Sequence, residues 1–221
     1  DSLVNSGKIA IIMNMEATRP SIWDVYREGS RFFMKEGDVY ETLRALATRL
    51  KEEGLEYALI GGLALTAHGY RRFTEDVDIL MTPETLRLFK EKFVGLGYLP
   101  AFATASKSFR NTRTGVKVEV MTTGEYPGDG KPKPVVFPDP ISARVERDGL
   151  WVLSLEKIIE LKLASGLSAS HRLKDLADVQ ELITILKLPL ELAGQLDASV
   201  RAEYQRLWQG AQSAPPEEGM S

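Results

Sequence analysis

The spacing of apolar residues changes once along this 221-residue chain, near Ser154. Upstream, from Asp38 onward, short apolar runs alternate with helical repeats and are separated by turns rich in glycine. Downstream, the segments 155–163, 173–186 and 190–208 all repeat their apolar residues at helical spacing. This order predicts an α/β (α+β) fold, with a small mixed sheet flanked by helices and a helical region after it.

The same change predicts how the chain is organised. We expect an N-terminal arm or helix over 1–37, a core over 38–153, a helical region over 154–210 and a disordered tail over 211–221. The tail is predicted because it contains two prolines followed by two glutamates and has few apolar residues.

Start and stop signals divide the core into elements. Asp38 begins a helix that ends at Gly54, and Thr82 caps a helix that begins at Pro83. Turn residues such as Asp148-Gly149 separate strands of two hairpins. The predicted strands are 57–60, 76–80, 106–110, 116–121, 144–146 and 150–153.

Two aspartates alternate with apolar residues in the second predicted strand. Asp76 and Asp78 leave the same face of a strand, roughly 7 Å apart along the backbone. Two carboxylates on one face repel each other unless a cation lies between them. Oxygen ligands of this kind suit Mg²⁺ or Mn²⁺, so the pair is a candidate metal site.

A glycine pair precedes the aspartates, between the first predicted strand and a short helix. Gly61 and Gly62 present no side chain that would keep a phosphate from the backbone N–H groups at the helix start. Arg72 and Thr74 add a positive charge and a hydrogen-bond donor just before Asp76. A lone Gly-Gly is usually a turn, but this order of groups within about twenty residues predicts a phosphate-and-metal site.

The composition excludes several other classes of site. The chain has no cysteine and two histidines, which excludes disulfides, a thiol nucleophile and a zinc site with several histidine ligands. The net charge of −3 excludes a strongly basic nucleic-acid coat but allows a local basic patch. No apolar run is long enough to cross a membrane, and 9–15 is too short for a signal peptide, so we expect a cytoplasmic protein.

The glycine pair, the helix ending in His68-Gly69, and the Arg, Thr and Asp-x-Asp that follow resemble the DNA polymerase beta-type nucleotidyltransferase superfamily. Within it, the sequence is most similar to the bacterial AbiEii-type toxin nucleotidyltransferases and their uncharacterised relatives. The resemblance covers roughly 54–186. It implies a nucleotidyltransferase core with a small mixed sheet, two divalent ions, and an NTP as nucleotidyl donor. It also suggests RNA, particularly a tRNA 3′ end, as acceptor and a cognate antitoxin as partner, while a protein hydroxyl or a small molecule such as an aminoglycoside stays open as acceptor on the same fold.

The resemblance further implies a third carboxylate on a neighbouring strand, and Glu119 is the candidate. The segment 116–120 alternates, with Lys117 and Glu119 on one face and valines on the other. Many family members have aspartate here. Glu119 is therefore predicted to bind metal or accept a proton, with a plain solvent-facing role as the alternative.

Lys162 stands where its helix should be apolar, on one stripe with Leu155, Ile158 and Ile159. Lysine is rarely buried without a partner. AbiEii-type relatives have a lysine in this helix, followed by an acidic motif, which implies that Lys162 binds the triphosphate. A structural ion pair with Asp175 or Asp178 is the alternative.

Two functions of different class remain open at this point. One is an active nucleotidyltransferase that uses Asp76, Asp78, Glu119 and Lys162 in catalysis. The other is a catalytically silent protein of the same fold that binds or regulates a partner, as an antitoxin does. His68 is a candidate catalytic base. Its place at the end of a short helix more often indicates a histidine that caps the helix or packs against it.

Overall fold

The computed structural model describes residues 37–213. The predicted arm over 1–37 therefore lies outside the described residues except for Gly37, and most of the predicted tail lies outside them too. None of the helices within 37–213 is long and apolar enough to cross a membrane.

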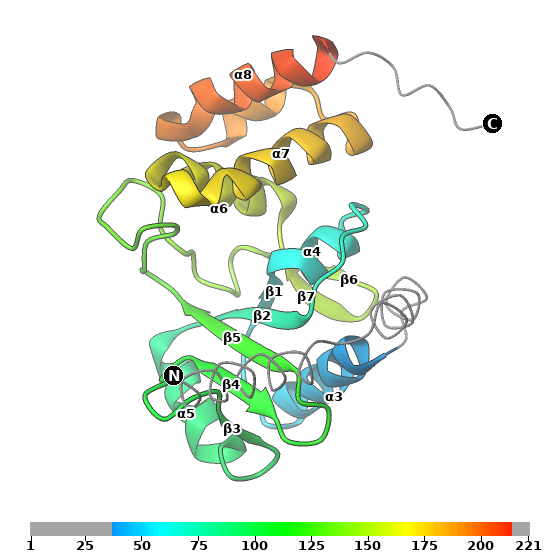
Figure 1. Cartoon of the computed structure of the whole chain (residues 1–221), viewed down its shortest axis with the longest axis vertical. Coiled ribbons are helices and arrows are strands. Elements are labelled where there is room, and N and C mark those ends of the chain that lie inside the picture. The colour runs from blue at the N-terminus through cyan, green and yellow to red at the C-terminus, as the bar shows by residue number, and fades with distance from the viewer. Residues whose placement is uncertain (1–36, 214–221) are drawn as a thin grey trace, which may run out of the picture.

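The fold is built on one mixed seven-stranded sheet (Figure 1), with the strand order β3-β4-β5-β2-β1-β7-β6. The three central strands are joined by one parallel pairing, β2 with β5, and one antiparallel pairing, β1 with β2. The strands are β1 Ala58–Ile60, β2 Asp76–Met81, β3 Tyr98–Pro100, β4 Ser108–Asn111, β5 Lys117–Thr122, β6 Arg144–Arg147 and β7 Leu150–Leu153.

The helices fall into two groups around this sheet (Figure 1). Helices α3 and α5 lie on the side of the sheet away from the C-terminal helices, whereas α4 lies toward them. The first group and α4 are α3 Asp38–Glu52, α4 Gly61–Ala67 and α5 Pro83–Phe93. The C-terminal helices are α6 Leu155–Ser168, η1 Ser170–Arg172, α7 Leu173–Leu186, η2 Leu190–Gln195 and α8 Ala198–Ser213.

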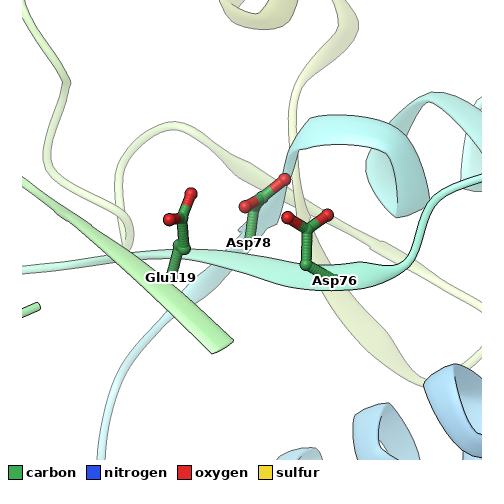
Figure 2. A group of neighbouring side chains, drawn as sticks. All are labelled: Asp76, Asp78 and Glu119. Atoms are coloured by element: carbon green, nitrogen blue, oxygen red, sulfur yellow. The ribbon is translucent and has the colours of Figure 1, made fainter. Parts of the chain in front are cut away.

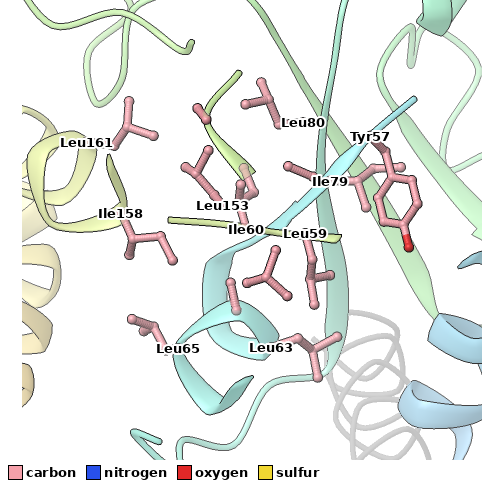
Figure 3. Packing of buried hydrophobic residues seen from close by; sticks show 14 of the residues in the cluster. Tyr57, Leu59, Ile60, Leu63, Leu65, Ile79, Leu80, Leu153, Ile158 and Leu161 are labelled. Carbon is pink, nitrogen blue, oxygen red and sulfur yellow. The ribbon is translucent and has the colours of Figure 1, made fainter. Parts of the chain in front are cut away.

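A continuous apolar core joins the sheet to the helical region. Leu59 of β1, Leu65 of α4 and Ile79 of β2 are almost completely buried in it. From the helical region, Ile158 and Leu161 of α6 point toward the same cluster (Figure 3). Since each fully buried side chain of this size contributes about 1.5–3 kcal/mol, the contact fixes α6 against the sheet.

Most of the predicted elements are confirmed. The strands predicted at 57–60 and 76–80 are antiparallel neighbours in the sheet, and both hairpins form. Thr82 caps α5 as predicted, because its Oγ1 accepts a hydrogen bond from the backbone N–H of Thr85 at 3.0 Å. The fold class is thus a mixed sheet with helices followed by a C-terminal helical region.

Two details differ from the prediction. The short edge strand β3 carries no strand signal in the sequence and forms by pairing with β4. The prediction of one continuous helix over 190–208 is wrong, because η2 ends before Asp197 and α8 begins after it. Asp197 Oδ1 accepts a hydrogen bond from the Ser199 N–H at 2.9 Å, which starts a new helix where apolar spacing alone shows no break.

Candidate active site

Three carboxylates lie together on the centre of the sheet. β2 and β5 are parallel, and their register places Asp78 directly beside Glu119. The side chains of Asp76, Asp78 and Glu119 leave the same face of the sheet (Figure 2), while Val77 and Ile79 between and beyond the aspartates are fully buried on the opposite face. Strand alternation therefore brings two aspartates and the predicted third carboxylate into one group.

The group is compact enough to hold a cation. One carboxylate oxygen from each residue lies within 4.8 Å of the others, and the cluster is the one group of at least three His, Cys, Asp or Glu side chains with such spacing within 37–213. Burial, together with the charges of Asp76 and Glu119, raises the pKa of Asp78 to about 7. The local surplus of negative charge is the physical condition that a divalent cation relieves.

Two neighbouring side chains position the outer carboxylates. Thr74 Oγ1 donates a hydrogen bond to Asp76 Oδ1 at 2.8 Å. Lys117 Nζ lies 2.8 Å from Glu119 Oε1 and 3.5 Å from Asp76 Oδ2. The hydrogen bond to Glu119 raises the pKa of Lys117 despite partial burial, so the lysine stays charged.

The two glycines are required by close packing around these side chains. Gly61 has a φ of +66°, and a Cβ on it would lie 2.0 Å from Asp78 Oδ2. A Cβ on Gly62 would lie 2.9 Å from Thr74 Cβ. The sequence analysis explained the pair by access for a phosphate. The structure adds a different reason, because the missing side chains make room for Asp78 and Thr74. Phosphate binding by these backbone N–H groups stays a prediction.

A cavity of about 370 Å³ opens beside the aspartates, between the sheet and the helical region. Its polar lining includes the predicted ligands Gly61, Gly62, Arg72, Thr74, Asp76, Asp78 and Lys162. Its apolar lining includes Ile60, Met121, Phe137, Leu153, Ile158 and Leu161. The cavity thus has a charged end at the carboxylates and an apolar wall from β5, β7, α6 and the loop after β5.

Lys162 and Arg72 both line this cavity, and both form an ion pair with the same carboxylate, that of Asp178. Lys162 Nζ lies 2.7 Å from Asp178 Oδ2 and 3.0 Å from Asp175 Oδ1. Arg72, from the loop between α4 and β2, also donates to Asp178 Oδ2. The alternative considered for Lys162, an ion pair with these aspartates, is therefore present, and the same lysine lines the cavity. Its predicted contact with a triphosphate stays a prediction.

Asp175, the second aspartate that pairs with Lys162, has partners on both of its carboxylate oxygens. Asp175 Oδ2 accepts hydrogen bonds from Ser165 Oγ at 2.7 Å and Arg172 Nε at 2.9 Å. Burial alone raises the pKa of Asp175, but Lys162, Ser165 and Arg172 outweigh burial and lower it.

Sequence reasoning missed several cavity residues that come from the helical region and the loop after β5. Ser165 of α6 carries no pattern of its own. The turn from α6 into η1 brings Arg172 to Ser165, where Arg172 Nε donates to Ser165 Oγ at 3.1 Å, and both residues line the cavity. The loop after β5 also contributes to the cavity, through Pro127 and Gly128. Gly128 has a φ of +77°, and a Cβ on it would lie 2.1 Å from Ser168 Oγ, so the loop rests on the end of α6. Lys117 was placed on the face of Glu119 by strand alternation, which is the signal for its contact with the carboxylates.

His68 does not line this cavity. It lies at the end of α4, where its Nε2 forms a hydrogen bond of 2.8 Å with the carbonyl oxygen of Leu153. Burial lowers the pKa of the imidazole, which keeps the side chain neutral near pH 7. The packing role expected for this histidine agrees with these contacts.

Solved structures share this fold. ANT(2″)-Ia in complex with adenylyl-2″-tobramycin matches with a TM-score of 0.50 and 15% identity, over 75% of this chain and 96% of that one. A protein from Thermotoga maritima, provisionally named a nucleotidyltransferase, matches with a TM-score of 0.46 and 24% identity, over 62% of this chain and 91% of that one. A similarly named protein from H. pylori has a TM-score of 0.43 and 19% identity, over 78% and 91% of the two chains.

No family model matches the chain. No curated protein matches it either. The likeness to ANT(2″)-Ia shows a common fold, and this chain carries an acidic triad on that fold.

Proposed function

We propose that this chain is a metal-dependent nucleotidyltransferase that moves an NMP from an NTP to an acceptor hydroxyl. The observation that carries the proposal is the acidic triad of Asp76, Asp78 and Glu119, with ligand oxygens within 4.8 Å of one another. Asp76 and Asp78 line a cavity that is also lined by Arg72 and Lys162, and Glu119 lies beside Asp78 on the neighbouring strand. Carboxylates for metal beside cations for phosphate are the parts that phosphoryl-group chemistry requires.

The donor set fits Mg²⁺ or Mn²⁺. All three side chains offer hard carboxylate oxygens, and burial with like charge raises the pKa of Asp78 to about 7, which shows that the group lacks positive charge. Asp76, Asp78 and Glu119 would hold the ion. Such an ion, when bound, polarises a phosphoryl oxygen and neutralises charge that develops during transfer.

The residues of the chain divide the remaining tasks. Arg72 and Lys162 bind phosphate oxygens of the NTP, and Thr74 holds Asp76 in place through its hydrogen bond. The acceptor oxygen attacks the α-phosphorus, a P–O bond to the acceptor forms, and the bond to the β-phosphate breaks to release pyrophosphate. Glu119 accepts the hydroxyl proton.

A second, open cavity of about 320 Å³ borders Glu119, which supports this role for the residue. Lys107, Phe102 and Met121 are among the residues that line it, and Met121 borders the first cavity as well. We propose that the NTP occupies the cavity beside Asp76 and Asp78 and that the acceptor approaches from the side of Glu119.

RNA is the acceptor that the AbiEii-type resemblance supports, with a toxin role and a cognate antitoxin as partner. The bound molecule named for ANT(2″)-Ia, adenylyl-2″-tobramycin, supports comparing RNA with small-molecule acceptors in one experiment. Each of the four α-labelled NTPs is incubated with the protein, Mg²⁺ and either total RNA, lysate protein or tobramycin.

If wild type labels RNA and the Asp76→Asn variant does not, the result supports the complete proposal. Label in protein or tobramycin keeps the transferase and rejects the RNA acceptor. The absence of label from every mixture, without any thermal shift by Mg²⁺ and NTP and with a partner protein that co-purifies, establishes the silent binding protein instead.

A further inference from the structure

Lys117 places an ammonium group inside the acidic triad. It is the first residue of β5, and the sheet register sets it directly beside Asp76, just as Glu119 lies beside Asp78. Its Nζ lies 2.8 Å from Glu119 Oε1 and 3.5 Å from Asp76 Oδ2. One cation therefore touches two of the three carboxylates that the proposed function assigns to the metal.

This lysine differs from the other cations near the cavity in what it touches. Lys162 and Arg72 form ion pairs with Asp178, which belongs to the helical region. The ion pairs of Lys117 are instead with triad members on the sheet itself. About a third of the Lys117 side chain is exposed (35%), so it has room to swing away from the carboxylates.

An ammonium and a divalent ion compete for the same oxygens. Both need carboxylate lone pairs at short range, and two positive charges a few ångströms apart repel each other. A divalent ion that binds Glu119 and Asp76 must therefore displace the Lys117 ammonium from at least one of them.

We propose that Lys117 is a built-in competitor for the metal, which occupies Glu119 and Asp76 in the metal-free protein and weakens the binding of free Mg²⁺ or Mn²⁺. The inference rests on the proposed function, because it assumes that the triad is a metal site. It assigns Lys117 a positioning role: the ammonium holds two carboxylates together until a metal, accompanied by the phosphates of an NTP, replaces it. In a metal–NTP complex, phosphate oxygens supply ligands in place of water, so binding depends less on the carboxylates. Competition by Lys117 therefore weakens the binding of free metal more than the binding of metal that arrives with nucleotide.

A purely structural lysine has the opposite effect on metal binding. If Lys117 only orients Glu119 and Asp76 for the metal, its removal leaves the ligands less ordered and weakens metal binding. If it competes, its removal strengthens metal binding. Partly exposed ion pairs contribute up to about fivefold each to an equilibrium constant. Since the metal must break at least one of the two pairs of Lys117 and weakens the other, removal of this lysine predicts a gain of about five- to tenfold.

The test measures Mn²⁺ binding without nucleotide by the loss of the free-ion EPR signal in wild type, Lys117→Met and Lys117→Arg. Lys92→Met is the matched control, since Lys92 also pairs with a glutamate, Glu53 at 2.5 Å, and is similarly exposed but lies on α5. Melting curves with and without Mn²⁺ verify that each variant folds and give a second measure of binding.

The proposal predicts that Lys117→Met binds Mn²⁺ about five- to tenfold more tightly than wild type, and that Lys117→Arg and Lys92→Met do not. Unchanged or weaker binding by folded Lys117→Met, with Mn²⁺ bound by wild type, overturns the competitor role and leaves the metal site standing. No binding by wild type or Lys117→Met at saturating Mn²⁺ overturns the competitor role and the proposed metal site together.

Discussion

Two groups of acidic side chains lie around the same cavity and differ in how their charge is balanced. On the sheet, Asp76 and Asp78 are joined by Glu119, and the pKa of Asp78 rises to about 7. In the helical region, Asp175 and Asp178 are surrounded by Lys162, Arg72 and Arg172, and the pKa of Asp175 is lowered. On the sheet, the negative charge of the carboxylates is thus only partly balanced by cations. In the helical region, each carboxylate is paired with at least one cation.

The difference separates two uses of buried carboxylates. A fully paired network holds elements together, and here it ties the loop before β2 to α6 and α7. A group whose negative charge is only partly balanced weakens the metal-free fold and persists where a ligand supplies the missing charge. The sheet group is therefore the candidate for chemistry, and the helical group is expected to maintain the shape of the cavity.

The largest expected effect is on activity at the sheet group. Asp76→Asn and Asp78→Asn each remove a metal ligand and with it several kcal/mol of charge stabilisation, so NMP transfer should fall by about 10²- to 10³-fold or more. The fold should remain intact, because neither carboxylate is needed for packing. The measurement is transfer of labelled NMP together with a melting curve. Full activity in either single variant would refute the assignment.

The helical group should respond mainly in stability. Lys162→Met removes the cation that Asp175 and Asp178 share, in a site where Lys162 is only 12% exposed. Arg172 and Arg72 remain as partners of the two aspartates, so the loss of unfolding free energy should be about 1.5–3 kcal/mol, the range for hydrogen bonds to charged groups. Arg87→Met is the exposed control, since Arg87 is 54% exposed and pairs with the exposed Glu84 and Glu91 on α5; it should change stability by less than about 1 kcal/mol.

The same variant also tests the phosphate role of Lys162. A triphosphate ligand is lost with the ammonium, so Lys162→Met should show a smaller thermal shift with Mg²⁺ and NTP than wild type. An unchanged nucleotide shift in a destabilised variant would make Lys162 purely structural. Unchanged stability without nucleotide would instead show that its two ion pairs contribute nothing to the fold.

The pH dependence of stability should differ between the groups in metal-free protein. Asp78 titrates near 3.8 when unfolded and about 7 when folded, so between these values the folded state binds one proton more. Raising the pH through this window removes stability from wild type but not from Asp78→Asn. Between pH 5 and pH 8 this amounts to about 2.6 kcal/mol, so the melting temperature of Asp78→Asn relative to wild type should rise by roughly 5–10 °C.

Asp175→Asn is the control for this titration, because the pKa of Asp175 is shifted in the opposite direction from that of Asp78. The pKa of Asp175 is lowered, so its stabilising contribution is lost only below its ordinary value of 3.8. Its melting temperature relative to wild type should thus stay constant between pH 5 and pH 8. A constant difference for Asp78→Asn as well would contradict the raised pKa.

The smallest expected effect concerns the single hydrogen bond by which the Thr74 hydroxyl positions Asp76. Thr74→Val keeps the shape packed against Gly62 but removes the Thr74 donor, and should reduce transfer by about tenfold. Thr66→Val is the control, because Thr66 Oγ1 donates to the Gly62 carbonyl oxygen within α4. Equal losses in both variants would show that the effect arises from packing around Gly62.

Local pattern was sufficient to predict much of the fold and of the site. Strand alternation alone placed Asp76 with Asp78 and Lys117 with Glu119, and helical spacing singled out Lys162 as a polar residue on an apolar stripe. The edge strand β3 and the break at Asp197 were not predicted, because pairing with β4 and a single cap decide them rather than any periodicity.

The sequence by itself determined which side chains share a face, because the periods of strands and helices are properties of the backbone. It did not determine which elements meet. The parallel pairing of β2 with β5 is what sets Lys117 beside Asp76 and Glu119 beside Asp78, and the packing of α6 on the sheet is what brings Lys162 to the same cavity as Arg72. The charge balance of each group follows from these long-range contacts, because electrostatic interactions depend on distance in space and burial and not on separation along the chain.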